Sequence, residues 1–503
     1  MNLDAIHQLF AITLPESILE IASILILVVD LGFFRTPARR AAHAARMTTA
    51  SVLGVLGCLA SLAWLIAHPA TASVMDGALV ATPVVAAAQA GILALTALVL
   101  VLGLTSRFTR NPGEYVALVL LSTTGMMLVA AARDLLLIFV ALELLSLSLY
   151  VLAAFSKSSP RSAEAALKYY LFGGMSAAFL LFGFSYLYGI AGTTSLVGIA
   201  AALATGTTPL ALVALVLVAV GLGFKVAVVP FHLWAPDTYQ GAPAPVAALI
   251  ASGSKVASFA VLIAVTAALI PSPGWTEVLL AMAAASILLG NLAALVQTSV
   301  RRLLACSAIA HAGYMLLGIS AHSPQSNQAV LLYALTYALT TVGAFAVVAI
   351  VERQTGSDRL SPDRLSPDRP GSDRPGSDRL DAFAGLSARN PLLAGTLLLF
   401  LLSLAGIPPL VGFWVKFNLF AAVLQSPSAH TWSLAAVILA VAASAVSLYY
   451  YLQVLKRAYV LPPAHPEPIP VSFVEMTVLV LIALATLALG LAPNLLVQWI
   501  PIG

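Results

Sequence analysis

Four charged residues lie inside long apolar stretches of this sequence: Glu143, Lys225, Lys255 and Lys416. An ionisable group at the centre of a bilayer costs at least about 2.5–3.5 kcal/mol, so such groups mark functional sites by default. Arginine, which stays protonated in proteins, is absent from this set, whereas a buried lysine or glutamate can exchange a proton near neutral pH. These residue types therefore indicate proton translocation across a membrane.

The glutamate and the first lysine form a candidate switch. Glu143 follows Arg133 by ten residues, a helical rise of roughly 15 Å, which is about half the hydrocarbon thickness. A nearby Glu143–Lys225 pair would favour both charged forms, and movement of the lysine to another partner would release the shared proton. A static buried ion pair that holds helices together is the alternative. Charges on four different spans weigh against it, because a structural pair needs only two.

Three further residues are candidate secondary relay groups. Two are histidines, the residue type that ordinarily titrates nearest to neutral pH: His232 in PFHLWAPD and His311 in AIAHAGY. Packing histidines with hydrogen bonds would have the same sequence pattern and are the alternative. Lys168 in EAALKYYLFGG stands at the entrance to a span, where it either relays protons or anchors the helix by placing its ammonium group at the surface.

The elements that must position these residues are transmembrane helices. Apolar residues make up 61% of the 503 residues and charged residues only 9%, which is outside the range of soluble proteins. Recurrent apolar runs are long enough to cross about 30 Å of hydrocarbon. We expect an all-α integral membrane protein of about fourteen transmembrane helices. The expected spans are 12–33, 47–67, 83–104, 114–132, 134–154, 163–190, 209–229, 244–269, 276–297, 303–321, 328–351, 391–424, 431–456 and 471–499.

Lysine and arginine alternate between the two sets of connecting loops. One set of loops contains only Arg133. The other contains Arg35, Arg39, Arg40, Arg46, Arg107, Arg110, Lys157, Arg161, Lys168, Arg301, Arg302, the arginines from Arg353 to Arg389, Lys456 and Arg457. Positively charged loops remain cytoplasmic, so this asymmetry predicts a multi-pass protein with both termini outside the cytoplasm.

Two of the predicted spans contain helix-breaking residues beside a lysine. Lys225 precedes Pro230, and Lys416 follows Pro408 and Pro409. Proline removes a helical hydrogen-bond donor and frees a carbonyl group, so we expect broken helices in spans seven and twelve. These spans are five apart, and an odd offset reverses orientation, as inverted repeats require.

A short repetitive segment, SDRLSPDRLSPDRPGSDRPGSDRL, occupies residues 357–380. Its balanced charges and its proline and glycine content predict a solvated linker, within a flexible loop at 354–381, and give no indication of nucleic-acid binding. The sequence has no P-loop, dinucleotide fingerprint, CxxC cluster or HExxH motif. We therefore expect no cofactor and no metal ion in this chain, and the energy for transport must come from an ion gradient or from another subunit.

Three segments resemble the antiporter-like subunits of respiratory complex I. They are LLLIFVALELLSLSLYVLAAF, GFKVAVVPFHLWAPDTYQGAPAPVAALIASGSKVASF and SLAGIPPLVGFWVKF, and together they hold all four charged residues. The resemblance covers nearly the whole chain except the repetitive segment at 357–380, in which each Asp is followed by Arg. The PDTYQGAP loop, and lysine at the positions of Lys255 and Lys416, make the chain most similar to the N type of this family in bacteria. The lack of further spans after the fourteenth argues against the L type.

This resemblance implies a fold of two inverted five-helix repeats. The first repeat would occupy 114–269 and the second 276–456, preceded by three helices within 1–113 and followed by one at 471–499. Glu143 and Lys225 would be the coupled pair, Lys255 the central relay and Lys416 the exit side of the proton channel.

The same resemblance implies a partnership with other membrane and peripheral subunits of an NADH:quinone oxidoreductase, including related antiporter-like subunits, in the bacterial inner membrane. FMN, iron–sulfur clusters and quinone would be bound by those partner subunits, so this chain would act in catalysis only within the complex. A subunit of a cation/proton antiporter is the alternative function, since it shares the same motifs, and a purely structural scaffold is a third class.

Overall fold

The computed structural model describes residues 3–34, 43–106, 108–206, 208–269, 274–354, 378–427, 431–463, 467–498 and 500. Most of the predicted linker at 357–380 lies outside the described residues, as do Arg35, Arg39, Arg40 and Arg107.

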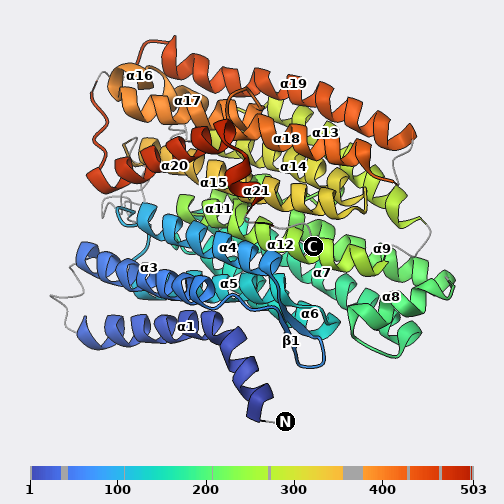
Figure 1. The fold of residues 1–503 in the computed structure, drawn as a ribbon. Coiled ribbons are helices and arrows are strands. Elements are labelled where there is room, and N and C mark those ends of the chain that lie inside the picture. Colours follow the sequence, from blue (N-terminus) through green and yellow to red (C-terminus); the bar gives the residue numbers. More distant parts are fainter. Residues whose placement is uncertain are drawn as a thin grey trace.

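Long helices make up most of the described chain and run side by side (Figure 1). Among the described residues, thirteen helical segments are long and apolar enough to cross a membrane. They are α1 (Leu3–Phe33), α3 (His43–Ala67), α4 (Pro83–Leu102), α5 (Pro112–Ala131), α6 (Leu135–Ala153), α7 (Pro160–Ala191), α9 (Pro209–Val226), α11 with α12 (Ala244–Ala251, Gly253–Leu269), α13 (Trp275–Leu295), α14 (Val300–Ile319), α15 (Pro324–Gln354), α19 (Thr431–Tyr459) and α20 (Phe473–Leu491). Two shorter apolar helices, α17 (Pro391–Ala405) and α18 (Val411–Gln425), occupy the twelfth predicted span. The expected helical membrane fold is thereby confirmed.

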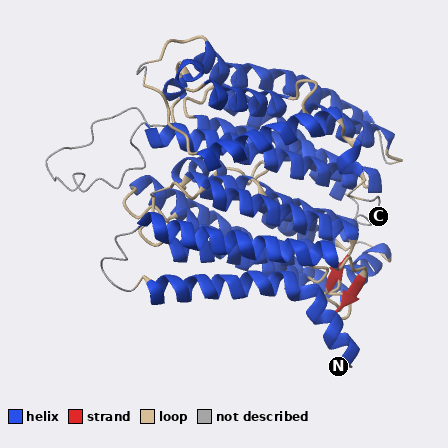
Figure 2. Cartoon of the chain, turned by 60° about the vertical axis from the view of Figure 1, so that its left-hand side comes forward, coloured by secondary structure: helices blue, strands red, loops and turns tan. Residues whose placement is uncertain are grey.

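Several short elements were not predicted from the sequence. Strands β1 (Ala72–Val74) and β2 (Leu79–Ala81) form an antiparallel hairpin between α3 and α4 (Figure 2). Its turn places Met75, Asp76 and Gly77 at positive φ. Strands of three residues are too short to produce an alternating pattern that a sequence could reveal. The remaining short helices are α8 (Leu196–Ala204), α10 (Trp234–Gly241), η2 (Leu380–Phe383), α16 (Leu386–Arg389) and α21 (Asn494–Val497).

Contacts between the connecting loops fall into two sets, one at each end of the helices. At one end, here called the hairpin side, bridges join the loops at Leu79↔Ala132 and Asp134↔Ser195. At the other end, here called the basic side, His43 Nε2 lies 2.7 Å from the carbonyl oxygen of Thr109, and a bridge joins Ser299↔Arg379. The contacts within each set connect alternate loops, which confirms the alternation of the spans.

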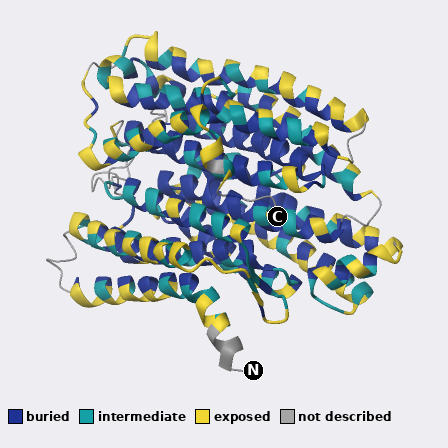
Figure 3. Ribbon diagram, viewed as in Figure 1, coloured by how far each residue is buried: buried dark blue, intermediate teal, exposed yellow. Residues whose placement is uncertain are grey.

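The most buried helices lie in the middle of the bundle (Figure 3). In the apolar 18-residue stretch of each helix, 94% of the residues are buried in α14 and 83% in α15, compared with 28% in α1 and in α20. The span formed by α11 and α12 is 89% buried. These central helices are covered on nearly all faces, so any ionisable residue on them must find its partners inside the protein.

Corresponding glycine contacts occur in the two halves of the chain. A Cβ at Gly125 on α5 would lie 2.6 Å from the backbone nitrogen of Leu145 on α6. At Gly290 on α13 it would lie 2.6 Å from the backbone nitrogen of Ala310 on α14. The same sequence distance separates Gly125 from Gly290 and Leu145 from Ala310. The helix pairs α5–α6 and α13–α14 thus approach each other through equivalent positions, as two repeats require.

Candidate proton path

The glutamate and lysine of the predicted switch lie on neighbouring elements of the first repeat. Glu143 is on α6 and Lys225 is in the last turn of α9, and both side chains are half-buried. The Lys225 ammonium donates a hydrogen bond to the hydroxyl of Ser146, one turn beyond Glu143 on α6. The ion pairs of the described residues include none between Glu143 and Lys225. The predicted pair therefore remains a prediction, and Ser146 holds the lysine in this conformation.

Two aromatic rings also lie near the Lys225 ammonium. Its Nζ lies 5.7 Å from the ring centre of Tyr150 and 5.4 Å from that of Phe224. Rings at this distance attract a cation through their electron-rich faces. Ser146 and Tyr150 are four residues apart on α6 and so share one helix face. The sequence analysis singled out neither of them.

Both predicted helix breaks are present, and they share one local structure. Helix α9 ends at Ala227 with φ 59°, and α17 ends at Gly406 with φ 89°. In each case the backbone N–H of this left-handed residue bonds to carbonyls of the preceding turn. A left-handed residue ends a helix and leaves carbonyl groups free for other partners. The break in the seventh span lies at its end, directly after Lys225, whereas the break in the twelfth lies between α17 and α18.

The span that holds Lys255 has a break that was not predicted. Helices α11 and α12 meet at Ser252, whose φ of −116° and ψ of −90° are not helical. Lys255 lies in the first turn of α12 and is only 2% exposed. Ser252 is neither a proline nor a left-handed glycine, so this break has no signal in the sequence.

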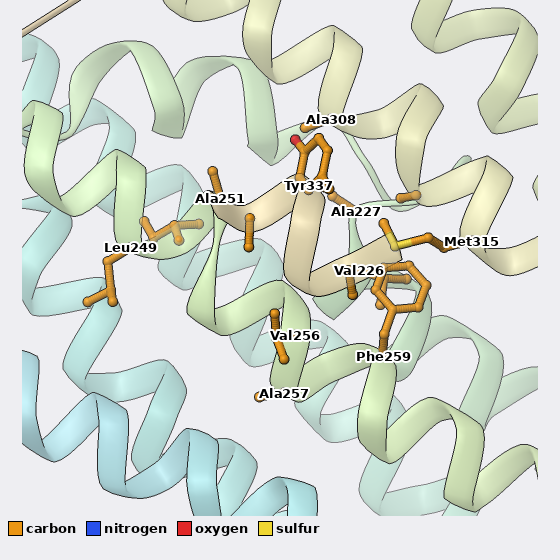
Figure 4. Packing of buried hydrophobic residues seen from close by; sticks show 14 of the residues in the cluster. Val226, Ala227, Leu249, Ala251, Val256, Ala257, Phe259, Ala308, Met315 and Tyr337 are labelled. Atoms are coloured by element: carbon orange, nitrogen blue, oxygen red, sulfur yellow. The ribbon is translucent and has the colours of Figure 1, made fainter. Parts of the chain in front are cut away.

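Lys255 reaches from the centre of the bundle to the second repeat. Its Nζ donates a hydrogen bond to the carbonyl oxygen of Ala308 on α14 at 2.5 Å and lies 5.5 Å from the ring centre of Tyr337 on α15. Figure 4 shows Ala308 and Tyr337 close together, with Val256 on the neighbouring helix α12. Helices α9 and α12 pack together, but among the described residues no hydrogen bond links the side chains of Lys225 and Lys255.

His311, one turn beyond Ala308 on α14, is surrounded by tyrosines. It is 3% exposed, its Nδ1 lies 2.8 Å from Tyr333 Oη, and its Nε2 lies 3.5 Å from Tyr451 Oη. Its ring centre is 4.8 Å from that of Tyr337. The sequence predicted His311 as a secondary relay but missed these hydroxyl partners. The spacing of Tyr333 and Tyr337, which places both on one face of α15, was the available signal.

Lys416 is 5% exposed and bonds to the broken end of the same span. Its Nζ donates to the carbonyl oxygens of Leu404 at 2.9 Å and Ala405 at 3.0 Å, and to the hydroxyl of Ser444 on α19 at 2.9 Å. The first two acceptors are carbonyls of the last turn of α17, which that helix leaves without internal partners. The break predicted from Pro408 and Pro409 thus supplies the polar atoms that make a buried lysine tolerable.

A small cavity lies between His311 and the broken twelfth span. Tyr333, Thr336 and Thr340 of α15 line it, together with Ser403 of α17 and Gly412 of α18. It offers about 10 Å³ for the centre of a water molecule, which is enough for roughly one. His311, the hydroxyl groups of α15 and the broken twelfth span therefore border a space of water size.

The remaining candidates, Lys168 and His232, lie apart from this line. Lys168 forms ion pairs of 2.7 Å with both Glu164 and Asp237 on the basic side. Burial alone would raise the pKa of Asp237, but hydrogen bonds from Lys168 and Arg302 outweigh it and hold that pKa below its ordinary value. His232 is half-buried after the end of α9, and its Nδ1 has no hydrogen-bond partner. Neither residue contacts the lysines of the path through a described hydrogen bond.

Known proteins are similar to this chain over most of its length. The family described as NADH:quinone oxidoreductase/Mrp antiporter, TM matches residues 132–444. Subunit N 2 of the NADH-quinone oxidoreductase of Acidobacterium capsulatum is 48% identical, and the alignment covers 99% of this chain and 100% of that protein. The chain belongs to the NADH:quinone oxidoreductase/Mrp antiporter family. The prediction of an N-type, antiporter-like membrane subunit is confirmed.

Other members of the family extend the comparison. Subunit N of the F(420)H(2) dehydrogenase of Methanosarcina mazei is 40% identical over 81% of each chain. A chain of respiratory complex I from Thermus thermophilus is 35% identical with a TM-score of 0.78, covering 97% of this chain and 100% of that one. A chain of the Mrp complex from Dietzia sp. has the same TM-score at 22% identity, covering 99% of this chain and 96% of that one, and so shares the fold.

Proposed function

We propose that this chain is the proton-translocating N-type membrane subunit of an NADH:quinone oxidoreductase, and that Glu143, Lys225, Lys255 and Lys416 carry the protons. The observation that supports this most directly is the set of partners of the two buried lysines. Lys255 and Lys416 bond only to neutral carbonyl and hydroxyl groups in the described residues. A lysine with neutral partners can lose its proton without leaving an unpaired carboxylate behind.

The order of groups suggests how a proton moves. A change in partner of Lys225, from Ser146 to Glu143, would alter the charge near the start of the path. Lys255 and Lys416 both lie within electrostatic reach of His311, so a proton gained by one disfavours a proton on the next. Moving one charge against 100 mV costs about 2.3 kcal/mol, and a change of a few kcal/mol in one such interaction is enough to drive a step.

Redox chemistry would take place in other subunits. In this proposal NADH oxidation, FMN, the iron–sulfur clusters and quinone belong to partner subunits, and this chain supplies only the proton path of a translocase. The partners include related antiporter-like subunits and the lipid bilayer. We further propose that the complex lies in the bacterial inner membrane, with the basic side in the cytoplasm and both termini outside, because loops rich in lysine and arginine remain cytoplasmic.

Replacement of the charged residues in the assembled complex tests this function. Glu143→Ala, Lys225→Ala and Lys416→Met should each abolish or severely reduce proton pumping, recorded with a pH-sensitive dye in vesicles energised with NADH. Lys456→Ala, at the basic end of α19, is the matched control and should pump normally. Unimpaired pumping by both the Glu143 and the Lys225 variants would remove the central claim.

The alternative is a subunit of a cation/proton antiporter, because the family description includes the Mrp antiporter. Purification of the tagged chain from its own membrane separates the two functions. Flavin and iron–sulfur proteins that purify with it support the oxidoreductase. Their absence, together with sodium/proton exchange in vesicles without any electron donor, supports the antiporter.

A further inference from the structure

A buried carboxyl group lies outside both predicted repeats, on the first helix. Glu16 on α1 is 5% exposed. Its Oε1 accepts a hydrogen bond of 2.9 Å from Gln89 Nε2 on α4, whereas its Oε2 is buried and has no hydrogen-bond partner within the part of the chain that the structure describes. No residue of the proposed path contacts it through a described hydrogen bond. An ionised carboxylate with an unpaired buried oxygen is costly, so this arrangement suits the protonated acid.

A cavity adjoins this carboxyl on the hairpin side. Glu16 and Gln89 line it, with Trp64 and His68 at the end of α3 and Thr82 after β2. It provides about 40 Å³ for the centres of water molecules, which is room for roughly three. His68, which is exposed, stacks on Trp64 with ring centres 3.7 Å apart. The cavity thus extends from a buried acid to an exposed histidine at one surface.

The groups around Glu16 can hold either protonation state. Gln89 donates to Glu16 and to the carbonyl oxygen of Met127 on α5, at 3.2 Å, which fixes the amide as a donor to the carboxyl. That donor stabilises the ionised form. Glu20 lies one turn further along α1 and is exposed. Among the described residues, the titratable groups that line the cavity are Glu16 and His68.

We infer that Glu16 is a proton-binding site that exchanges with the solution on the hairpin side through this cavity, separately from the path of the four charged residues. In the loaded state the proton sits on Oε2. On release it passes to cavity water, and from there to the solution past His68, while the Gln89 amide keeps its hydrogen bond to the carboxylate. The inference does not rest on the proposed function, because Glu16 and Gln89 lie on spans outside the repeats and none of the four charged residues of the path lines the cavity.

Chemical labelling of the intact complex in proteoliposomes tests the site. Dicyclohexylcarbodiimide adds to a protonated carboxyl group in an apolar environment: the carboxyl oxygen bonds to the central carbon, and the acid proton goes to nitrogen. Mass spectrometry of the peptide that contains both residues should find the adduct on Glu16 several-fold more often than on Glu20, the matched control on the same helix. The yield should fall as the pH on the hairpin side rises, and remain constant when only the pH on the basic side changes.

Infrared difference spectra between acidic and alkaline pH give a second measurement that does not depend on reagent access. A carboxylic acid band that changes with pH should disappear in Glu16→Gln and persist in Glu20→Gln, with both variants assembled. An unlabelled Glu16, a yield that follows the pH on the basic side, or a spectrum unchanged in Glu16→Gln would each overturn the inference. Pumping by the Glu143 and Lys225 variants bears only on the proposed function, so the two claims fail separately.

Discussion

The Lys225 ammonium donates a hydrogen bond to the hydroxyl of Ser146, one helical turn beyond Glu143. The lysine therefore has a neutral partner on the same helix as its predicted acidic partner. A second position beside Glu143, one turn away, would differ in charge environment, as the predicted proton switch requires.

Removing the neutral partner should disturb this switch without removing either charge. In Ser146→Ala the lysine loses its hydroxyl partner and should remain with Glu143, so pumping should decrease several-fold while NADH oxidation continues. Ser148→Ala, which truncates a buried serine on another face of α6, is the control and should pump normally. Equal pumping by both variants would show that Ser146 only packs. Dye-based pumping rates, divided by NADH oxidation rates, provide the measurement.

A positive charge at position 255 should not by itself be sufficient for proton pumping. Lys255→Arg keeps a positive charge in the centre of the bundle, but arginine does not release its proton. Since a positioned proton-transfer group contributes about 100-fold or more to rate, pumping should decrease by about that factor. The complex should still assemble, as judged by native gel electrophoresis. Substantial pumping by the arginine variant would mean that Lys255 acts as a fixed charge rather than as a relay.

Removal of the Tyr333 hydroxyl should reduce stability and pumping more than removal of the hydroxyl of Tyr115, which is equally buried. Tyr333→Phe leaves His311 Nδ1 without its 2.8 Å partner, at a cost of about 1–3 kcal/mol, and should lower both thermal stability and pumping. Tyr115 has a buried hydroxyl with no partner, so Tyr115→Phe should leave both unchanged. Equal thermal stability and equal pumping in Tyr333→Phe and Tyr115→Phe would contradict a role of the Tyr333 hydroxyl in the proposed path.

The span positions and the buried charges could be predicted from the sequence, because each depends on composition over a whole helix. It did not reveal the break at Ser252 or the tyrosines around His311. Those features depend on which face of α12 or α15 meets a neighbour. Helices buried on all faces, as α14 and α15 nearly are, have no polar face from which that could be inferred.

The ion pairs of Asp237 with Lys168 and Arg302 on the basic side predict a pH dependence of stability. The pKa of Asp237 lies below its ordinary value, so its contribution is fully present above the unfolded pKa of about 3.9 and is lost as the pH falls through the folded pKa. Asp237→Asn should lower the thermal midpoint at pH 7 by the equivalent of about 1 kcal/mol or less, because the group is partly exposed. The difference from the unsubstituted protein should shrink below about pH 4. Asp381→Asn, which breaks an exposed ion pair of 3.3 Å with Arg457, is the control and should have no measurable effect at either pH. A difference between Asp237→Asn and the unsubstituted protein that grows on acidification would contradict the stabilising role of the Asp237 carboxylate.

The equivalent glycines of the two halves should be equally intolerant of a side chain. At Gly125 and at Gly290 a Cβ would lie 2.6 Å from a backbone nitrogen of the neighbouring helix, so α5 must move from α6, or α13 from α14. Such overpacking costs typically about 1–3 kcal/mol, and Gly125→Ala and Gly290→Ala should each lower the thermal midpoint and the yield of assembled complex by similar amounts. Gly174 on α7 has no atom within 4 Å of its would-be Cβ, so Gly174→Ala should be neutral or stabilising by up to about 1 kcal/mol. If only one of the first two variants were destabilised, the contacts would not be counterparts, and the repeat assignment for these helices would be wrong.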